Sequence, residues 1–208
     1  MAIIGFFRSF LDIGSVFVLL KIFKRIDAAQ SNTGYSDLHS LFLAARDGWG
    51  KGQIVEIGAY KGKSTIALAA GSKLKCREKV LSIDPHSEGT REEFQRNISQ
   101  SGLADYVITK VATSREAAGE YKGLIRLIFI DGLHDYNSVK QDIELWKDRV
   151  IDGGLIAFHD YDYSTVFQAV KELTDCPGYI FEAEVGCTAF VSKKRSQNQD
   201  LFRAIRDF

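Results

Sequence analysis

The segment that decides the fold reads Val55-Glu56-Ile57-Gly58-Ala59-Tyr60-Lys61-Gly62-Lys63-Ser64-Thr65. An apolar run that ends at Ile57 predicts a short strand. Gly58 and Gly62 predict a tight turn after it, because glycine lets the backbone turn sharply and approach a ligand closely. A helix that begins near Lys63 would point its free amide groups into that turn. The segment therefore predicts a strand, a glycine-rich loop and a helix, an arrangement that often binds nucleotides.

Strands and helices alternate on both sides of this segment. The run Leu124–Ile130 is almost continuously apolar, which is typical of a strand covered on both faces. The alternation predicts a doubly wound α/β fold, with helices on both faces of a mainly parallel sheet. The expected strands are Gln53–Ile57, Val80–Ile83, Tyr106–Thr109, Leu124–Ile130, Gly154–Phe158, Tyr179–Glu184 and Cys187–Val191. The expected helices are Ser36–Arg46, Ser64–Ala70, Arg91–Gln100, Ser114–Tyr121, Val139–Trp146 and Ser164–Leu173.

The carboxyl ends of four expected strands should carry the chemistry, because ligands of such sheets bind there. These ends follow Ile57, Ile83, Ile130 and Phe158. Asp84 comes directly after the second of them and follows Gly58 by 26 positions. An acidic residue roughly 20 positions after a glycine loop commonly accepts the hydroxyl groups of a ribose. We therefore predict that Asp84 binds a ribose.

A phosphate-binding loop is the first alternative. The stretch Gly62-Lys63-Ser64 matches the end of the motif G-x-x-x-x-G-K-[ST], but Ile57 occupies the position of the motif's first glycine. Gly58 lies one position too late, so the loop is short for wrapping a phosphate. The apolar strand before Asp131 still resembles the Mg²⁺-holding strand of P-loop enzymes. A nucleotide hydrolase or kinase therefore stays as the alternative function.

Glu56 favours a different ligand, because a carboxylate before the loop suits a cation better than a triphosphate. Glu56, Gly58 and Gly62 together resemble the first motif of class I S-adenosylmethionine-dependent methyltransferases, and the resemblance extends over residues 53–191. It implies a Rossmann-like sheet of seven strands, in which a C-terminal hairpin contributes one antiparallel strand. It also implies S-adenosylmethionine as cofactor. The cofactor-binding residues that this resemblance implies are Glu56, Gly58, Ala59, Tyr60, Gly62, Ser64, Thr65, Asp84, Ser114 and Asp131.

Two later segments narrow the resemblance. Asp131-Gly132-Leu133-His134-Asp135-Tyr136 is followed by a predicted helix, then by Gly153-Gly154 and by His159-Asp160-Tyr161. This combination resembles a subgroup of small bacterial methyltransferases, many of which modify sugars or secondary metabolites on oxygen. The resemblance implies O-methylation of a small hydroxylated acceptor.

Methyl transfer to oxygen requires a group that accepts the hydroxyl proton. Imidazole titrates near neutral pH, so His134 is the first candidate for the general base. His159, at the neighbouring strand end, is the second candidate, and Asp131 completes the predicted catalytic set. A protein that binds a cofactor or partner on this fold without catalysis is the remaining alternative.

A divalent metal stays open at this stage. Related sugar and catechol O-methyltransferases hold Mg²⁺ at positions that correspond to Asp131, His159 and Asp160. The sequence departs from their pattern, because one acid is a histidine and Mg²⁺ prefers oxygen ligands. Leu133 also stands where the sugar-modifying relatives have an acidic base. Two alternatives therefore fit the sequence. One is a metal-free reaction in which His134 is the base, and the other is a softer divalent ion that His159 helps to bind.

Composition limits the partners and the location. Lys and Arg together number 27, as do Asp and Glu, and the pI is about 6.9. The chain therefore lacks the positive field of a nucleic-acid-binding protein. The three cysteines form no C-x-x-C pair, which fits a reducing, cytoplasmic location.

The two ends of the chain are predicted to lie outside the methyltransferase domain, residues 35–195. Residues 1–34 have the pattern of an amphipathic helix and a loop, and Arg8 and Asp12 interrupt a run that is too short to span a membrane. We expect this helix to act as a lid or to form a homodimer, because an exposed Phe-rich face is a liability. Contact with a membrane surface is the less favoured alternative. Residues 196–208 are expected to form a helical tail.

Overall fold

The computed structural model describes residues 33–194 and 199–206. The N-terminal segment 1–32, for which we predict an amphipathic helix, lies outside the described residues. The helices are α2 (Tyr35–Asp47), α3 (Lys63–Leu74), α4 (Arg91–Ser101), α5 (Ser114–Glu120), α6 (Tyr136–Trp146), α7 (Ser164–Asp175) and α8 (Gln199–Arg206). The strands are β1 (Gln53–Ile57), β2 (Val80–Ile83), β3 (Val107–Lys110), β4 (Ile125–Ile130), β5 (Val150–Phe158), β6 (Tyr179–Val185) and β7 (Thr188–Lys193).

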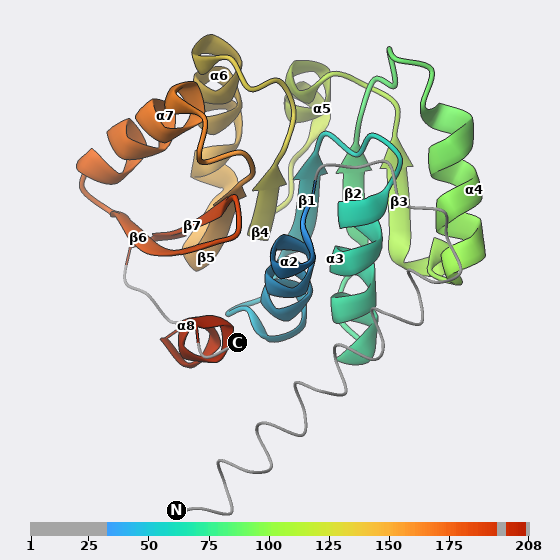
Figure 1. The fold of residues 1–208 in the computed structure, drawn as a ribbon, viewed down its shortest axis with the longest axis horizontal. Coiled ribbons are helices and arrows are strands. Elements are labelled where there is room, and N and C mark those ends of the chain that lie inside the picture. Colours follow the sequence, from blue (N-terminus) through green and yellow to red (C-terminus); the bar gives the residue numbers. More distant parts are fainter. Residues whose placement is uncertain (1–32, 195–198, 207–208) are drawn as a thin grey trace, which may run out of the picture.

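The strands of the described chain form one seven-stranded sheet in the order β3-β2-β1-β4-β5-β7-β6 (Figure 1). β1 pairs in parallel with both β2 and β4. β2 pairs in parallel with β3, and β4 pairs in parallel with β5. β7 runs antiparallel to both of its neighbours, β5 and β6. The predicted fold, a mainly parallel sheet with one antiparallel strand from a C-terminal hairpin, is confirmed. The strand order reverses between β1 and β4, which is where sheets of this kind bind ligands.

Helices cover both faces of the sheet. Because successive side chains of a strand point to opposite faces, Ile54 packs in the layer of α2, α3 and α4, whereas Val55 packs in the layer of α5, α6 and α7. β4 shows the same division, with Phe129 in the first layer and Ile128 in the second. All four side chains are fully buried. Burial on both faces explains why the sequence of β4 is almost continuously apolar.

Arg126 is the one charged residue of β4, and its side chain is completely buried. The guanidinium pairs with Glu78 and donates hydrogen bonds to the carbonyl oxygens of Ala44 and Ala45 near the end of α2. The Ala44 carbonyl oxygen also accepts the backbone N–H of Gly48 at 2.9 Å, so Arg126 adds a second donor there and supplies one to Ala45 in the last turn of the helix. Arg126 therefore attaches α2 to the sheet at the amino end of β4.

Asp37 connects the beginning of the described chain to its C-terminal hairpin. Its Oδ1 accepts hydrogen bonds from the backbone N–H of Cys187 and from the hydroxyl of Thr188, both at 2.8 Å. Gly186, at the hairpin turn, has φ +60°, and a Cβ there would lie 2.4 Å from the Asp37 carboxylate. The hairpin turn therefore packs directly against the first turn of α2.

β5 extends beyond its sequence-based boundary. β5 begins at Val150 rather than at Gly154, because Gly153 adopts φ +80° and lets the strand bulge and continue its pairing with β4. In the C-terminal tail, α8 packs Phe202 against Phe190, with 5.7 Å between the ring centroids. Among the described residues, no helix is long and apolar enough to cross a membrane.

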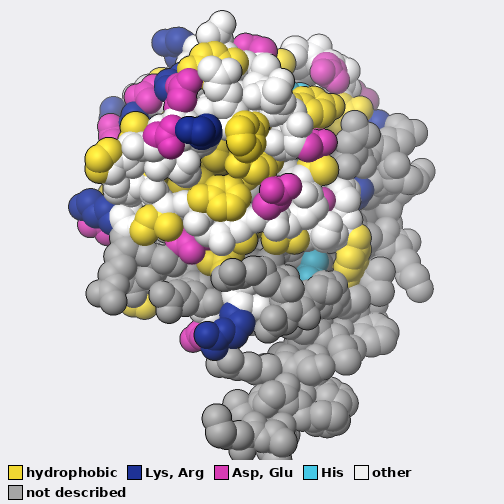
Figure 2. Space-filling view, turned by 60° about the vertical axis from the view of Figure 1, so that its left-hand side comes forward, with side chains coloured by type: hydrophobic (Ala, Val, Ile, Leu, Met, Phe, Trp, Pro, Cys, Tyr) yellow, Lys and Arg dark blue, Asp and Glu magenta, His cyan; other side chains and the backbone are white. Residues whose placement is uncertain are grey.

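One side of the molecule carries an exposed apolar surface over α7 and β6 (Figure 2). Its centre is an aromatic patch in which Tyr161 contacts Phe167 and Phe181, at ring-centroid distances of 5.3 and 5.7 Å. Phe167 and Phe181 are 47% and 42% exposed. The patch lies outside the cavity described below.

Candidate active site

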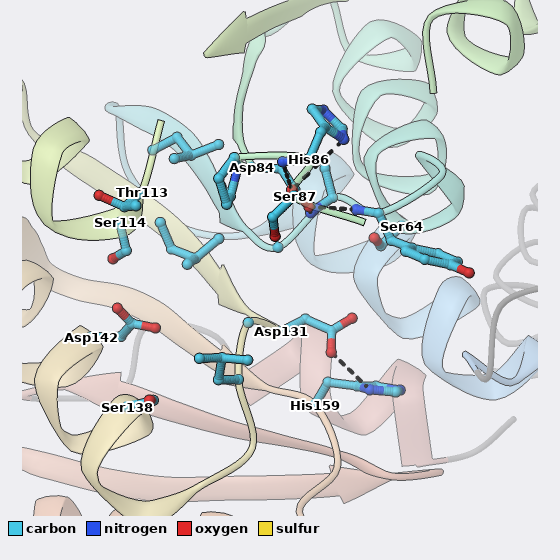
Figure 3. A pocket seen from close by; sticks show the side chains of 18 of the residues that line it. Ser64, Asp84, His86, Ser87, Thr113, Ser114, Asp131, Ser138, Asp142 and His159 are labelled. Carbon is cyan, nitrogen blue, oxygen red and sulfur yellow. Dashed lines mark hydrogen bonds and ion pairs between the residues drawn. The ribbon is translucent and has the colours of Figure 1, made fainter. Parts of the chain in front are cut away.

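The carboxyl ends of β1, β2, β4 and β5 open into one cavity of about 660 Å³ (Figure 3). This volume is in the range of small-molecule binding sites. Most residues predicted for the site line the cavity: Gly58, Ala59, Tyr60, Ser64, Asp84, Ser114, Asp131, His134, His159 and Asp160. The structure brings these residues together from positions that are far apart in the sequence. Glu56, Gly62 and Thr65 are not part of the cavity wall.

The loop between β1 and α3 adopts its shape because of its glycines. Gly58 has φ +84°, and a Cβ at this position would lie 2.0 Å from the carbonyl oxygen of Asp131. Gly62 caps α3 in the left-handed conformation, with φ +88°. The loops after β1 and β4 therefore approach each other more closely than any side chain at position 58 would allow.

Asp84 holds the glycine-rich loop in place. Its Oδ2 accepts hydrogen bonds from the backbone N–H groups of Ala59 and Tyr60 at 2.8 and 2.7 Å, and its Oδ1 accepts one from His86 N–H at 2.6 Å. A carboxylate has about four acceptor positions. One acceptor position of Asp84 is therefore left free of these three bonds, and the predicted binding of a ribose by Asp84 stays a prediction.

The same contacts argue against the phosphate-binding alternative. A phosphate loop needs free backbone N–H groups that point at the anion. Here the N–H groups of Ala59 and Tyr60 already donate to Asp84, whose negative charge would repel a phosphate. The loop is thus built to present a carboxylate to the cavity rather than an anion-binding nest.

Glu56 does not contact the cavity, in contrast to the expectation from the sequence. Its side chain is fully buried beneath the loop, where it accepts hydrogen bonds from Ser64, Thr65 and Ser82 at 2.6, 2.5 and 2.7 Å. The physical reason is the strand geometry, which turns position 56 into the layer under α3. Thr65 is fully buried because it lies on the side of α3 that faces the sheet, where its hydroxyl donates to Glu56. Glu56 therefore anchors the first turn of α3 to β1 and β2.

The burial of Glu56 makes stability depend on pH. Burial raises the pKa of Glu56 to about 7, although the hydrogen bonds from Ser64, Thr65 and Ser82 work in the opposite direction. The folded protein then binds this proton more tightly than the unfolded chain does. The stabilising contribution is complete below the unfolded pKa, near 4.5, and is lost as the pH rises to about 7.

We expect Glu56→Gln to remove this loss, because an amide does not ionise. The free energy of unfolding of the wild-type chain should fall between pH 5 and pH 7 by up to roughly 1.4 kcal/mol per pH unit from this group, relative to the variant. Urea unfolding of both proteins across this range gives the difference, in which the contributions of all other groups cancel. Parallel curves for the two proteins would contradict the assignment.

Four polar side chains gather where β4 and β5 end. His159 Nδ1 lies 3.1 Å from Asp131 Oδ1 and 3.3 Å from Asp160 Oδ1. His134 Nδ1 lies 3.1 Å from the other oxygen of Asp160. The His159 side chain is 4% exposed, whereas that of His134 is 40% exposed. His134 is therefore the imidazole that an incoming molecule reaches, and His159 lies behind it between the two carboxylates.

The charges of this cluster shift its pKa values. Burial of His159 works to lower its pKa, but the contact with Asp131 and the charges of Asp131 and Asp160 outweigh it and raise the pKa to about 9. Burial raises the pKa of Asp131, against the opposing effect of His159. Perturbed groups that meet in a cavity are typical of functional sites.

Local contacts fix the position of His134. Asp135 caps α6, because its side chain accepts a hydrogen bond from Ser138 N–H at 3.1 Å. The carbonyl oxygen of His134 accepts a hydrogen bond from the Thr165 hydroxyl at 2.6 Å, which attaches the loop to α7. The Tyr163 ring packs edge-on against the imidazole, with 5.8 Å between the ring centroids.

The opposite end of the cavity is formed by α5 and α6. Thr113 and Glu116 form a capping box at the start of α5, which places Ser114 at the wall. Ser114 accepts a hydrogen bond from Trp146 Nε1 at 2.9 Å. Asp142 lines the same end and was missed from the sequence. Asp142 lies on the buried face of α6, three positions after Val139. The sequence signal that could have identified it is an acidic residue at a helical position that is otherwise apolar.

The candidate metal ligands differ from the set expected from the sequence. Among the described residues, Asp131, His134 and Asp160 each offer a ligand atom, and these atoms lie within 4.8 Å of one another. His159 was expected in this set, but its Nδ1 already contacts both carboxylates. His134 is the imidazole of this trio, while the expected role of His159 as a metal ligand stays a prediction.

Comparison with solved structures places this fold among methyltransferases. The chain is similar to the O-methyltransferase NovP, with a TM-score of 0.70, 16% identity, and coverage of 90% of this chain and 100% of that chain. It is also similar to the SAH-bound Podospora anserina methyltransferase PaMTH1, with a TM-score of 0.67, 16% identity, and coverage of 87% and 88%. An O-methyltransferase from Bacillus cereus in complex with SAH gives a TM-score of 0.65, 18% identity, and coverage of 85% and 90%.

The amino-acid sequence itself also matches a family. Residues 55–161, just over half of the chain, match the family described as "Methyltransferase domain". The match begins at the strand before the glycine-rich loop and ends directly after Asp160, so it contains the four strand ends that line the cavity. This chain therefore belongs to the methyltransferase-domain family.

Proposed function

We propose that this protein is an S-adenosylmethionine-dependent O-methyltransferase that acts on a small hydroxylated acceptor, a sugar or a secondary metabolite. The observation that carries the proposal is the pair of His134 and Asp160 at the accessible side of a cavity whose other walls offer Asp84 and Ser114. The solved structures described as O-methyltransferases, one of them in complex with SAH, support the same reaction class.

His134 accepts the proton of the acceptor hydroxyl in this proposal. The Asp160 carboxylate contacts Nδ1, so Nδ1 carries a hydrogen and Nε2 is the free base. S-adenosylmethionine, when bound, supplies a methyl group on a sulfonium. The oxygen–methyl bond forms as the methyl–sulfur bond breaks, its electron pair stays on sulfur, and the hydroxyl proton moves to Nε2 of His134. Positioning of the oxygen in line with that bond supplies the remaining acceleration.

A metal is not needed for this mechanism, although the trio of Asp131, His134 and Asp160 fits one. Two carboxylates and an imidazole suit a borderline ion such as Mn²⁺ or Zn²⁺ better than Mg²⁺. These three residues would hold it, and the ion would supply positive charge that favours ionisation of the acceptor hydroxyl. His134 would then be occupied, so the base and the ligand are exclusive roles for one side chain.

Chelation separates the two roles. We expect methyl transfer to persist at close to the untreated rate after dialysis against an excess of EDTA, because His134 and Asp160 act without an ion. The rate of methyl transfer and the metal content of the protein are measured before and after dialysis. Loss of activity that Mn²⁺ or Zn²⁺ restores would assign His134 to the metal and overturn its role as base.

The experiment that tests the function is calorimetric titration with S-adenosylmethionine, S-adenosylhomocysteine and ATP with Mg²⁺, followed by methyl-transfer assays on catechol and on methyl rhamnoside. We expect saturable binding of both sulfur compounds and transfer of the methyl group to an acceptor hydroxyl. Binding of ATP alone would overturn the proposal and support the nucleotide hydrolase or kinase. The homodimer and the cytoplasmic location stay predictions, and the oligomeric state is measured by light scattering.

A further inference from the structure

We infer that Asp142 recognises the exocyclic amine of the adenine in the nucleoside-containing cofactor. The inference rests on the proposed function, because it assigns a specificity-determining residue to the same cavity. Asp142 is 5% exposed and lies on α6, whereas the other acidic residues of the cavity wall follow strands β2, β4 and β5 or stand in the loop before α4. Its role is therefore separate from those of Asp84 and Asp131.

The shape of the cavity gives the orientation of the nucleoside. Figure 3 shows Thr113, Ser114 and Asp142 at one end and Asp131 and His159 at the other. Asp84, the carboxylate that we assign to the ribose, belongs to the wall between these ends. In such a cofactor the base and the sulfur are attached to opposite sides of the ribose. With the sulfur near Asp131 and His134, the base reaches the end formed by Ser114 and Asp142.

The hydrogen bonds of this end leave an acceptor for the base. Trp146 Nε1–H donates to Ser114 Oγ at 2.9 Å, so the Ser114 hydroxyl hydrogen is available for a neighbour. The Asp142 carboxyl group lies near Ser114, which works to lower its pKa. Figure 3 shows the two side chains pointing toward one another. Because Asp142 lines the cavity, its carboxyl group offers acceptor positions to a bound molecule.

The neighbouring polar groups do not offer the same chemistry. The Gln141 side-chain oxygen accepts a hydrogen bond from Arg115 at 2.6 Å, which engages both of these cavity-lining residues with each other. Burial raises the pKa of Asp142, against the effect of Ser114. Its carbonyl oxygen accepts hydrogen bonds in either protonation state. A buried acceptor of this kind is costly unless a donor reaches it, and the adenine amine is such a donor.

The test compares S-adenosylhomocysteine with S-inosylhomocysteine, in which a carbonyl oxygen replaces the amine. By calorimetry, we expect the wild-type protein to bind the adenine compound at least ~10-fold more tightly, since a site built to pair a donor rejects an analogue that lacks it. Asp142→Asn presents an amide that donates to the carbonyl oxygen, so the ratio of the two affinities should fall at least ~10-fold. Ser138→Ala, which shortens a side chain at the same end of the cavity, should leave the ratio unchanged.

The outcomes separate this inference from the proposed function. Absence of binding of S-adenosylhomocysteine to the wild-type protein overturns the proposed function itself. Binding with the same affinity ratio in wild type and Asp142→Asn overturns the role of Asp142 alone. If the variant does not fold, the wild-type affinity ratio still tests the inference. Equal affinity for the two compounds would mean that no side chain recognises the amine, which overturns the role of Asp142.

Discussion

Replacing His134 by alanine is expected to lower kcat for methyl transfer by a factor of roughly 10²–10⁴, the usual contribution of a general base. Affinity for S-adenosylhomocysteine should stay at the wild-type value, because the imidazole meets the acceptor side of the cavity and not the nucleoside. The measurement combines steady-state kinetics with the best acceptor from the assays above and calorimetry with S-adenosylhomocysteine. The reason for the large effect is that, within the described part of the chain, His159 is the nearest other imidazole and is buried behind His134.

Two further observations make the role of His134 specific. Added imidazole should restore part of the lost kcat of His134→Ala, because the cavity left by the ring admits a small base from solution. Asp160→Asn should also lower kcat, since it removes the carboxylate that keeps the hydrogen on Nδ1 of His134 and leaves Nε2 free. An unchanged kcat in His134→Ala would place the base elsewhere. Failure of the wild-type protein to methylate any acceptor, despite binding the cofactor, would support the non-catalytic alternative.

Gly58→Ala is expected to have the second large effect, on both folding and cofactor binding. The new Cβ would lie 2.0 Å from the Asp131 carbonyl oxygen and 2.6 Å from its carbonyl carbon, so the backbone of one loop must move. The left-handed conformation and this displacement together should lower the free energy of unfolding by roughly 2–5 kcal/mol. Binding of S-adenosylhomocysteine should fall below detection. The displaced loops carry Asp131 and the backbone N–H groups of Ala59 and Tyr60, which hold Asp84 in place. Urea unfolding and calorimetry measure the two effects.

The chain offers a matched control for this variant. Gly102 has φ +72°, close to the +84° of Gly58, but a Cβ there would meet no atom within 4 Å. Gly102→Ala should therefore cost only the conformational penalty of roughly 1–2 kcal/mol and leave cofactor binding unchanged. Equal destabilisation in the two variants would mean that the loops after β1 and β4 do not approach each other as described.

The fold could be predicted from the sequence because its signals are local. The central strands β1 and β4 are short runs of mainly apolar residues, and the glycines and polar residues that follow them mark the turn at the carboxyl end. The limits of β1 agree with the expected Gln53–Ile57, since Gly52 and Gly58 bound an uninterrupted strand. β5 was expected too short because glycines normally end a strand. The bulge at Gly153 depends on pairing with β4, which is not a local property.

The site could be predicted less completely, because side-chain direction depends on contacts across the fold. The loops that meet at the cavity follow from the topology, and they include Asp84, Asp131 and His134. The burial of Glu56 follows from its position within β1, where the alternation of side chains turns it under α3 and away from the ligand. Asp142 reaches the cavity from a helix rather than from a strand end. An acid inside an apolar stripe marks such a residue, but the sequence does not tell which cavity it faces.

The contact between Asp37 and the hairpin turn has a consequence for the order of assembly. Asp37 and its partners Cys187 and Thr188 lie 150 and 151 positions apart in the sequence. β7, which follows the same hairpin turn, lies between β5 and β6 in the sheet. A nascent chain that stops before this hairpin leaves the Asp37 carboxylate without these two donors and β5 with an open edge. The domain therefore reaches its final packing only after this hairpin has been synthesised, and contacts of such long separation close slowly.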